Sequence, residues 1–425
     1  MTDAASGARA EGLRGWPRKN TAQAHAERAR RVREAAGLAE EDAEAFDVDL
    51  DRFGAAQEML TGIAVIPVGV VGPIAVELGR YEHAEPDGRP IEVGRSAEQL
   101  HLPLAHTEGG LTASVYRGAS AATQDGPIRA YVVADGMTRD TCLELASAGE
   151  ALRAARAIEG WLADMRAWLQ ASDLDFVSRH AVLRGVETHV VGPWCHVLYR
   201  FSTGEACGPN MMTRNAYALN TGYLVERLAS EVGVRPRRIA LEANMGGDKK
   251  PSHRYFERGG HGKTVIAEAT LSARTIGRVL RTSAEDLLAL ERMGVHGSVA
   301  SGMQSAAFTP ASAVAAVFAA TGQDLGMVGT SSMAHATCVP ADDGGLHVAI
   351  RLAGVEVGVL GGGTTLPYAR TWLRALRCQG EGGAFRLAQI VAVAALCLDL
   401  SAAASMATAG SANFVEAHHT RGGLR

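Results

Sequence analysis

Three charged residues follow a glycine-rich turn at Asp248, Lys249 and Lys250. The turn, Asn244 to Gly247, comes directly after a predicted strand, and its glycines let a ligand approach the backbone closely. A lysine in such a place can neutralise an oxyanion as it develops, and preorganised charge of this kind is usually the largest contribution to catalysis. The same run is also typical of a solvated loop, so it indicates a reaction centre only in company with other groups.

Two carboxyl groups could form a reaction centre together with this lysine. Glu108 lies in the glycine-flanked segment His106 to Gly110, and a glutamic acid enclosed by such a loop can act as a general acid near neutral pH. Asp324 follows a predicted apolar helix, Ala311 to Ala320. Helix caps and surface turns use the same residue types, so neither position is diagnostic alone.

Two further patterns are weaker. His418 and His419 lie near the C-terminus, where a histidine pair is more often exposed than catalytic. Adjacent histidines also point in different directions, which disfavours joint metal binding. Gly361 to Gly363 follow a predicted strand and suit either a phosphate cradle or a plain turn. No G-x-G-x-x-G opens a helix near the start and no G-x-x-x-x-G-K-[ST] occurs, so an ordinary Rossmann or P-loop site is not expected.

The composition is that of a folded globular chain. Of 425 residues, 47% are hydrophobic and 21% charged, and 42 basic against 46 acidic side chains give a net charge of −4. This balance argues against a nucleic-acid binder. The N-terminus lacks the apolar stretch of a signal peptide, no charge-free apolar run reaches membrane-spanning length, and the six cysteines form no C-x-x-C pair. We therefore expect a cytoplasmic protein with reduced thiols, no membrane contact and no cysteine-bound zinc.

The predicted elements indicate an α+β fold in which a small domain is inserted into a large one. Residues 1–57 favour an N-terminal helical segment. Residues 141–240 predict the order β-α-β-β-α-β of the ferredoxin-like unit, as a cofactor domain. It would interrupt a larger helical and β domain for the substrate, made of residues 58–140 and 241–425. Within the larger domain we expect a turn at Asp135 to Met137, a strand hairpin over 343–360 and an alanine-rich helix over 384–409.

The order of the motifs resembles that of the hydroxymethylglutaryl-CoA reductase family, over about Glu58 to His418. Six segments match family motifs in sequence: Ile66–Pro73 (I-P-V-G-V-A-G-P), Thr107–Gly109 (T-E-G), Asp135–Arg139 (D-G-M-T-R), Asp248–Pro251 (D-K-K-P), Gly322–Asp324 (G-Q-D) and Gly361–Thr364 (G-G-G-T). The D-K-K form resembles the eukaryotic-type class I enzymes, in their soluble catalytic part. The ordered set is far more specific than any one of its motifs.

The resemblance implies a reaction and roles for the polar residues. In the family a CoA thioester is reduced twice, with one hydride from NADPH each time, to a hemithioacetal and then, after loss of the thiol, to a primary alcohol. Hydroxymethylglutaryl-CoA gives mevalonate and CoA. By the resemblance, Lys249 stabilises the oxyanion, Glu108 protonates the aldehyde oxygen, and Asp324 lies between them. His418, in a V-x-x-H pattern, protonates the departing thiolate from a mobile C-terminal segment.

The resemblance also implies two binding surfaces and an assembly. The cofactor is expected to be NADPH rather than NADH, because an arginine suits its additional phosphate. The cofactor-binding positions would be Ser178, Arg179, Glu205, Gly208, Asn210, Gly361, Gly362 and Gly363. The substrate-binding positions would be Ser114, Arg117, Arg139, Asp248, Lys250 and Arg292. Glu58 to Gly62 resembles the family's dimer-contact motif, so we expect a homodimer with the site at the subunit interface, and no metal ligands.

The recognition residues depart from the family pattern. Glu205, Cys207 and Pro209 replace an aspartate and two methionines around the nicotinamide. The family lysine that binds the free carboxylate of the substrate is missing, and Arg292 lies one position away from it. Two alternatives therefore stay open: a relative that reduces another CoA-bound or carrier-bound acyl group, and a non-catalytic relative. Retention of the four catalytic residue types argues against the second.

Overall fold

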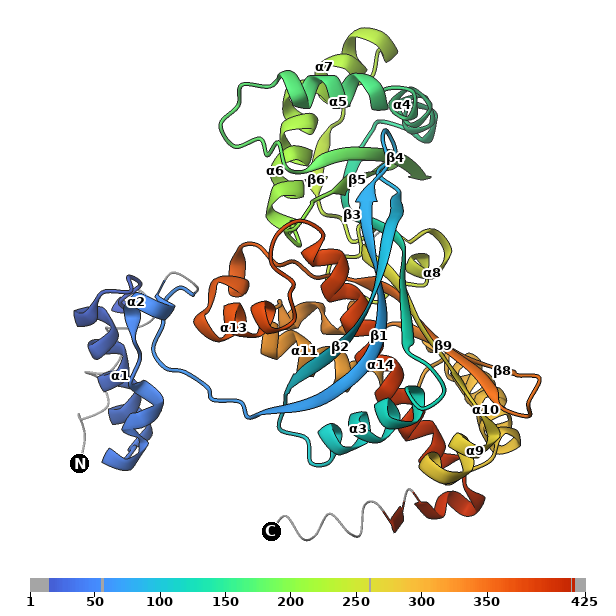
Figure 1. Cartoon of the computed structure of the whole chain (residues 1–425). Helices are drawn as coiled ribbons and strands as arrows, with labels where there is room; N and C mark the ends of the chain where they lie inside the picture. The colour runs from blue at the N-terminus through green and yellow to red at the C-terminus, as the bar shows by residue number, and fades with distance from the viewer. Residues whose placement is uncertain (1–14, 55–56, 260, 414, 417–425) are drawn as a thin grey trace, which may run out of the picture.

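The computed structural model describes residues 15–54, 57–259, 261–413 and 415–416, which form an N-terminal arm and two sheets with their helices (Figure 1). The arm contains α1 (Ala22–Ala36), η3 (Glu40–Phe46) and α2 (Leu50–Phe53). Helix α1 begins where the Thr21 hydroxyl accepts a hydrogen bond from the N–H of Ala24, and it ends at Gly37 in the left-handed conformation. The arm stands to one side of the main body, to which an extended segment connects it.

The larger sheet has the strand order β2-β1-β3-β7-β9-β8. Its strands are β1 (Val68–His83), β2 (Pro90–Ala105), β3 (Ile128–Glu144), β7 (Gly262–Leu271), β8 (Ala334–Pro340) and β9 (Leu346–Val355). All neighbouring strands are antiparallel except β1 and β3, which are parallel. The mixture of helices and a mixed sheet confirms the α+β prediction.

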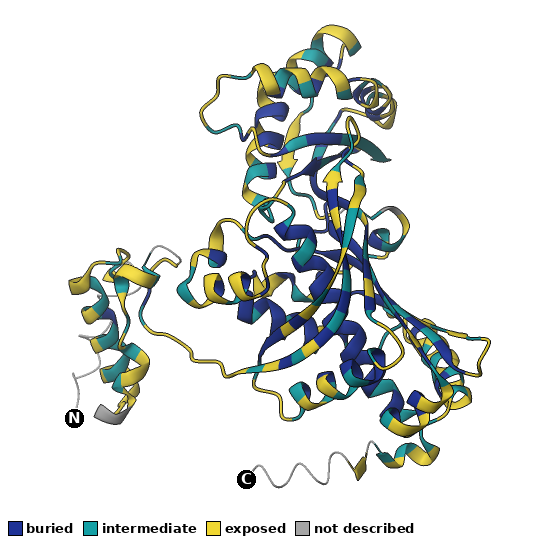
Figure 2. Cartoon of the chain, in the orientation of Figure 1, coloured by how far each residue is buried: buried dark blue, intermediate teal, exposed yellow. Residues whose placement is uncertain are grey.

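The core of this part forms around α14 (Gly383–Met406), which packs against the sheet and against α3 (Leu111–Ala122) and α11 (Pro310–Thr321). Helix α14 is long and apolar enough to pass a membrane-span test by composition, yet 89% of its most apolar stretch is buried inside the protein. Figure 2 shows this helix as a dark blue column between the sheet and its surrounding helices. At the crossing of α3 and α14, a side chain at Gly118 would collide with the Cys397 carbonyl oxygen, so only glycine fits there.

The smaller sheet contains β4 (Val182–Val191), β5 (Trp194–Ser202), β6 (Arg238–Leu241) and the second half of β3. The pairing order is β4-β5-β3-β6, and every pair is antiparallel. Its own core is formed with α4 (Ala148–Glu159), α5 (Leu162–Ala171) and α6 (Pro209–Leu219), and α6 continues through η4 (Asn220–Leu224), α7 (Val225–Arg227) and η5 (Leu228–Val232).

The remaining helical elements line the loops between strands. They are α8 (Arg254–Arg258), α9 (Ala273–Thr275), η6 (Ile276–Leu280), α10 (Ala284–Ser301), η7 (Leu325–Met327), α12 (Val328–Ser331), η8 (Gly362–Thr365), α13 (Pro367–Ala375) and η9 (Ala409–Ser411).

Two local predictions are wrong. The Asp135-Gly136-Met137 segment is not a turn, because it lies inside β3 and pairs with β7 and β5. The hairpin predicted over 343–360 instead joins β8 to β9, and the residues after Val355 leave the sheet as a loop. In both cases strand pairing across the sheet, which local sequence does not report, decides the conformation.

Candidate active site

Three loops that are distant in sequence meet where the two sheets adjoin. The backbones of Gly322 and Gly363 lie so close that a side chain on either would strike the other's carbonyl oxygen. The N–H of Gly358 donates to the Gln323 side chain at 3.0 Å, and the N–H of Val359 donates to the Glu205 carbonyl at 2.7 Å. The structure thus brings together the G-Q-D, G-G-G-T and 204–210 segments, as their motif order indicates.

The outer edge of this meeting point holds an ion pair between Lys249 and Asp324. The Lys249 Nζ lies 2.7 Å from Asp324 Oδ2, and the two side chains are 48% and 47% exposed. The hydrogen bond to Asp324 raises the pKa of Lys249 above its usual value, against a smaller opposing effect of burial. Asp324 Oδ1 also accepts the N–H of Gly326 at 2.9 Å, so the aspartate caps η7 and holds the lysine at once.

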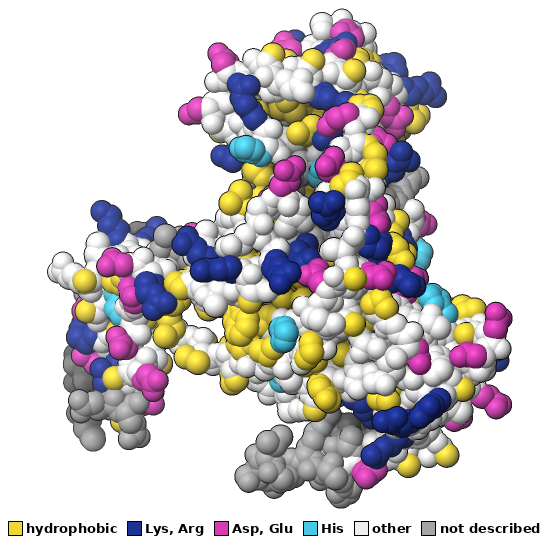
Figure 3. All heavy atoms as spheres, in the orientation of Figure 1, with side chains coloured by type: hydrophobic (Ala, Val, Ile, Leu, Met, Phe, Trp, Pro, Cys, Tyr) yellow, Lys and Arg dark blue, Asp and Glu magenta, His cyan; other side chains and the backbone are white. Residues whose placement is uncertain are grey.

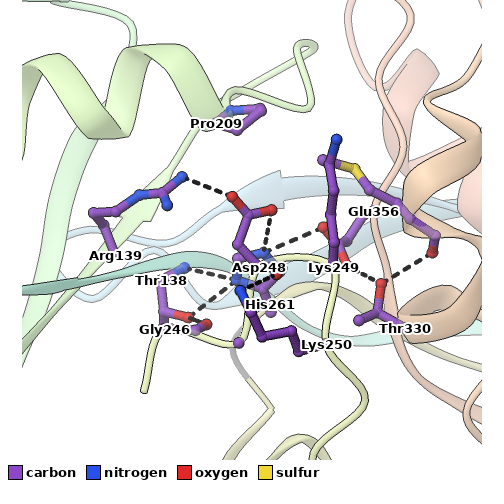
Figure 4. A network of polar contacts seen from close by, with 12 residues as sticks. Thr138, Arg139, Pro209, Gly246, Asp248, Lys249, Lys250, His261, Thr330 and Glu356 are labelled. Atoms are coloured by element: carbon purple, nitrogen blue, oxygen red, sulfur yellow. Dashed lines mark hydrogen bonds and ion pairs between the residues drawn. The ribbon is translucent and has the colours of Figure 1, made fainter. Parts of the chain in front are cut away.

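Beneath that pair lies a set of buried charges that starts at Asp248. Arg139, whose side chain is 5% exposed, bridges Asp248 Oδ2 at 3.2 Å and Glu242 Oε2 at 3.0 Å. Figure 4 shows the Asp248 carboxylate between Arg139 and the ring of His261. Lys250 points outward and donates from Nζ to the Asp248 carbonyl at 2.9 Å, so it supports the turn.

His261 and Glu356 complete this set, and no sequence pattern had singled them out. Both are buried, and His261 Nε2 lies 3.2 Å from Glu356 Oε2 and 3.9 Å from Asp248 Oδ1. The Thr330 hydroxyl donates to the other oxygen of Glu356. His261 directly precedes β7 and Glu356 follows β9, and these strands pair, so only the sheet topology brings the two residues together.

Two other predicted catalytic or substrate residues lie apart from the ion pair. Glu108 is exposed in the loop between β2 and α3, and within the described part of the chain no ion pair or hydrogen bond joins it to Lys249 or Asp324. Arg292 is exposed on α10, the helix that covers β8. His418 lies outside the described residues.

Of the two predicted substrate-binding residues on α3, Arg117 forms its hydrogen bonds within the protein. Arg117 donates from Nε to the Ser401 hydroxyl at 3.0 Å and from a terminal nitrogen to the Ser401 carbonyl and the Ser405 hydroxyl. Burial lowers the pKa of its guanidinium. Arg117 therefore joins α3 to α14, while Ser114 is a partly exposed residue one turn before it.

Among the predicted cofactor-binding residues, Glu205 forms hydrogen bonds within the protein, whereas two glycines have open space beside them. The Glu205 carboxylate accepts the N–H groups of Gly382 at 2.6 Å and Ala384 at 2.7 Å, which caps α14. By contrast, Gly361 and Gly362 adopt positive φ angles of 81° and 56° and have open space where side chains would lie.

The rest of these positions lie at the start of α6 and in the loop between α5 and β4. Gly208, with φ 89°, precedes the first turn of α6, where Asn210 is exposed. Ser178 and Arg179 border a small cavity of about 120 Å³ between α5 and β4. The Ser178 backbone is fixed there by the Asn215 side chain, which accepts its N–H at 2.8 Å and donates to its carbonyl at 2.9 Å.

Comparison with known proteins places these features in a family. Residues 24–422 match the family model described as hydroxymethylglutaryl-coenzyme A reductase. The 3-hydroxy-3-methylglutaryl-coenzyme A reductase of Aeropyrum pernix is 35% identical over 88% of this chain and 83% of that protein. The protein of the same name from Halobacterium salinarum is also 35% identical, over 86% of this chain and 84% of that protein.

Solved structures give a similar result for the fold. The class II 3-hydroxy-3-methylglutaryl-CoA reductase of Streptococcus pneumoniae, bound to NADPH in open conformations, has a TM-score of 0.63 at 16% identity. The match covers 90% of this chain and 96% of that chain. At this level of identity the similarity is one of fold.

Proposed function

The chain belongs to the hydroxymethylglutaryl-coenzyme A reductase family, and from this premise we propose that it reduces hydroxymethylglutaryl-CoA to mevalonate and CoA with two NADPH. The observation that carries the proposal is the Lys249–Asp324 pair, at 2.7 Å, in the place where the family motifs meet. A fixed ammonium of this kind suits a reaction in which a carbonyl oxygen becomes negative.

The ion pair gives Lys249 a defined task. NADPH supplies a hydride to the carbonyl carbon in each reduction. The Lys249 ammonium neutralises the oxygen of the tetrahedral product, and Asp324 keeps the lysine protonated because it raises its pKa. We assign to His418 the protonation of the CoA thiolate and to Glu108 the protonation of the aldehyde oxygen before the second reduction.

The separation of Glu108 from its own Lys249 supports a homodimer. An exposed Glu108 can reach a Lys249–Asp324 pair on a second copy, which would complete the site across the interface. Exposed apolar side chains on and after α10, at Met293, Val299 and Met303, also suit burial against another subunit.

The cofactor proposal rests on space and charge. Gly361 and Gly362 leave room for a ligand against the backbone, and Arg179 borders a cavity into which a phosphate could fit. Figure 3 shows Lys and Arg side chains, with Asp and Glu side chains among them, across the middle of one face below the smaller sheet, and the basic groups suit polyanionic ligands such as NADPH and CoA. Gly361, Gly362 and Arg179 therefore fit the cofactor, whereas the Glu205 carboxylate caps α14.

We further propose that residues 141–240 form a ferredoxin-like NADP-binding domain, inserted into a large catalytic domain of residues 58–140 and 241–425. The strand order β4-β5-β3-β6, with all pairs antiparallel and helices between strands, supports this assignment. Arg179→Ala should raise the KM for NADPH several-fold while leaving that for NADH nearly unchanged. An unchanged preference for NADPH would contradict the phosphate assignment.

The direct test is loss of NADPH absorbance with purified protein and hydroxymethylglutaryl-CoA, next to a panel of other acyl-CoA thioesters. Two NADPH consumed for each hydroxymethylglutaryl-CoA would support the proposal. Oxidation with another thioester alone would favour the second candidate, a reductase for a different acyl group. The observation that favours this candidate is the exposed position of Arg292 on α10, without an ion pair in the described structure, where a carboxylate anchor is expected.

A further inference from the structure

Three buried polar atoms face one another below the Lys249 loop. They are Asp248 Oδ1, His261 Nε2 and Glu356 Oε2, and none of them has a hydrogen-bond partner among the described residues. His261 and Glu356 are 0% and 1% exposed, and the three atoms all lie within 4.8 Å of one another. We propose that these three side chains bind one divalent metal ion of the zinc type.

The distances suit a metal ion in the middle of the three atoms. His261 Nε2 is 3.2 Å from Glu356 Oε2 and 3.9 Å from Asp248 Oδ1. Ligands bound to zinc at about 2.0–2.2 Å in tetrahedral geometry stand roughly 3.4 Å apart. The two distances lie on either side of that value, and the third, between Asp248 Oδ1 and Glu356 Oε2, is at most 4.8 Å, so an ion would draw the carboxylates inward.

The other nitrogen of His261, Nδ1, has two hydrogen-bond partners in Thr138. The Thr138 N–H donates to Nδ1 at 3.3 Å, which favours a proton on Nε2 in the metal-free chain. The Thr138 hydroxyl lies 3.0 Å from Nδ1 and donates to the Gly246 carbonyl at 2.7 Å, so its oxygen can accept a hydrogen from Nδ1. A metal ion at Nε2 would displace the proton there, and Nδ1 would then donate to the Thr138 hydroxyl, an outer partner of the kind that is typical of metal ligands.

The charges of the cluster call for a cation. The second oxygen of Asp248 pairs with Arg139, which it shares with Glu242. The second oxygen of Glu356 bonds only the neutral hydroxyl of Thr330, and within the described ranges no lysine or arginine pairs with Glu356. A buried ionised carboxylate is costly without a compensating charge. One imidazole nitrogen and two carboxylate oxygens are a ligand set that Zn²⁺ accepts.

A bound ion would join three segments of the chain. Asp248 lies in the same loop as Lys249, His261 directly precedes β7, and Glu356 directly follows β9. The ion would therefore fix the loop that presents Lys249. This role is structural, because no reaction step passes through the metal, although Asp248 is also one of the predicted substrate-binding residues.

The test is metal binding by the purified full chain after treatment with a chelator. Calorimetric titration with Zn²⁺ should give about one equivalent bound per chain, and the melting temperature should rise with Zn²⁺. His261→Ala and Glu356→Gln should each weaken binding more than about 10-fold. Thr138→Val, which removes the outer partner, should weaken it by about 10–100-fold.

The matched control is His347→Ala. This histidine also faces a carboxylate, Glu268, at 3.3 Å, but among the residues that the structure describes it pairs with no second acid. Its variant should bind Zn²⁺ as the unaltered chain does. Failure of the unaltered chain to bind Zn²⁺, or equal binding by a folded His261→Ala variant, would overturn the proposal and indicate that a proton on Nε2 serves as the cation. Metal content is read without turnover, so its outcome is separate from that of the reductase assay.

Discussion

Asp248 and Lys249 are neighbours in the chain, yet they belong to regions with opposite character. The side chain of Asp248 is 19% exposed and belongs to an inner cluster with Arg139, His261 and Glu356. That of Lys249 is 48% exposed and pairs with an equally exposed Asp324. Fixed, buried charges hold the loop in place, whereas an accessible pair can exchange its partner for a ligand. We therefore expect inner substitutions to cost stability and outer ones to cost activity.

Arg139→Met should have the largest effect on stability. It leaves the carboxylates of Asp248 and Glu242 without their shared cation, and breaking a buried ion pair costs about 3–5 kcal/mol. Urea unfolding followed by circular dichroism measures the loss. The control is Arg129→Met, because the Arg129–Glu77 pair is 49% and 27% exposed and should contribute at most about 1 kcal/mol. Equal losses in the two variants would remove the distinction between inner and outer charges.

Lys249→Ala should show the reverse behaviour. The loss of the ammonium that faces the developing oxyanion should lower kcat about 10²–10³-fold. The free energy of unfolding should change by no more than about 1 kcal/mol, because the ion pair is half exposed. NADPH oxidation and urea unfolding on the same preparation give both values. A variant that keeps its activity would refute the role of Lys249. A variant that unfolds would show that Lys249, like the inner charges, stabilises the fold.

Gly118→Ala tests whether burial alone, without charge, produces a comparable loss of stability. The new methyl group would collide with the Cys397 carbonyl oxygen in α14, and overpacking of this kind costs about 1–3 kcal/mol. Gly297 is also helical, but has open space at its Cβ position, so Gly297→Ala should be neutral or stabilise by up to about 1 kcal/mol. Thermal unfolding of the two variants provides the comparison.

Asp324→Asn should have the smallest of these effects, a shift in the pH dependence of kcat. Asp324 raises the pKa of Lys249, so the stabilisation from their pair is complete below the ordinary lysine pKa and is lost as pH rises through the raised value. Without the carboxylate, Lys249 loses its proton at lower pH. The alkaline limb of the residual kcat profile should move down in pH, and an unmoved limb would show that another group sets it.

The outer region was largely predictable from sequence, because its parts lie in contiguous motifs. The lysine loop, Asp324 and the Gly361–Gly363 segment each follow a strand or helix that composition predicts, and the structure brings them together. The buried helix over 384–409 was also predictable, and it is α14 with nearly the same bounds. Local patterns suffice where a residue's neighbours in space are its neighbours in the motif.

The inner region was not predictable in the same way. His261 and Glu356 are ordinary single residues in the sequence, and they meet only because β7 pairs with β9. Glu205 follows a family motif, but its carboxylate is used to cap a helix that begins far along the chain at Gly383. Such contacts depend on strand pairing and helix placement, which a single sequence does not display.

The strand β3 has a consequence for how the two sheets can be separated. Residues 128–136 pair with β1 and β7, and residues 137–144 pair with β5 and β6, within one uninterrupted strand. The smaller sheet is therefore not a removable cassette. In a chimera that exchanges the smaller sheet between relatives at residue 141, the junction would fall inside β3, and the two parts of this strand would come from different proteins. An exchange that folds therefore has to include all of β3, and the exchanged β3 must still pair with β7.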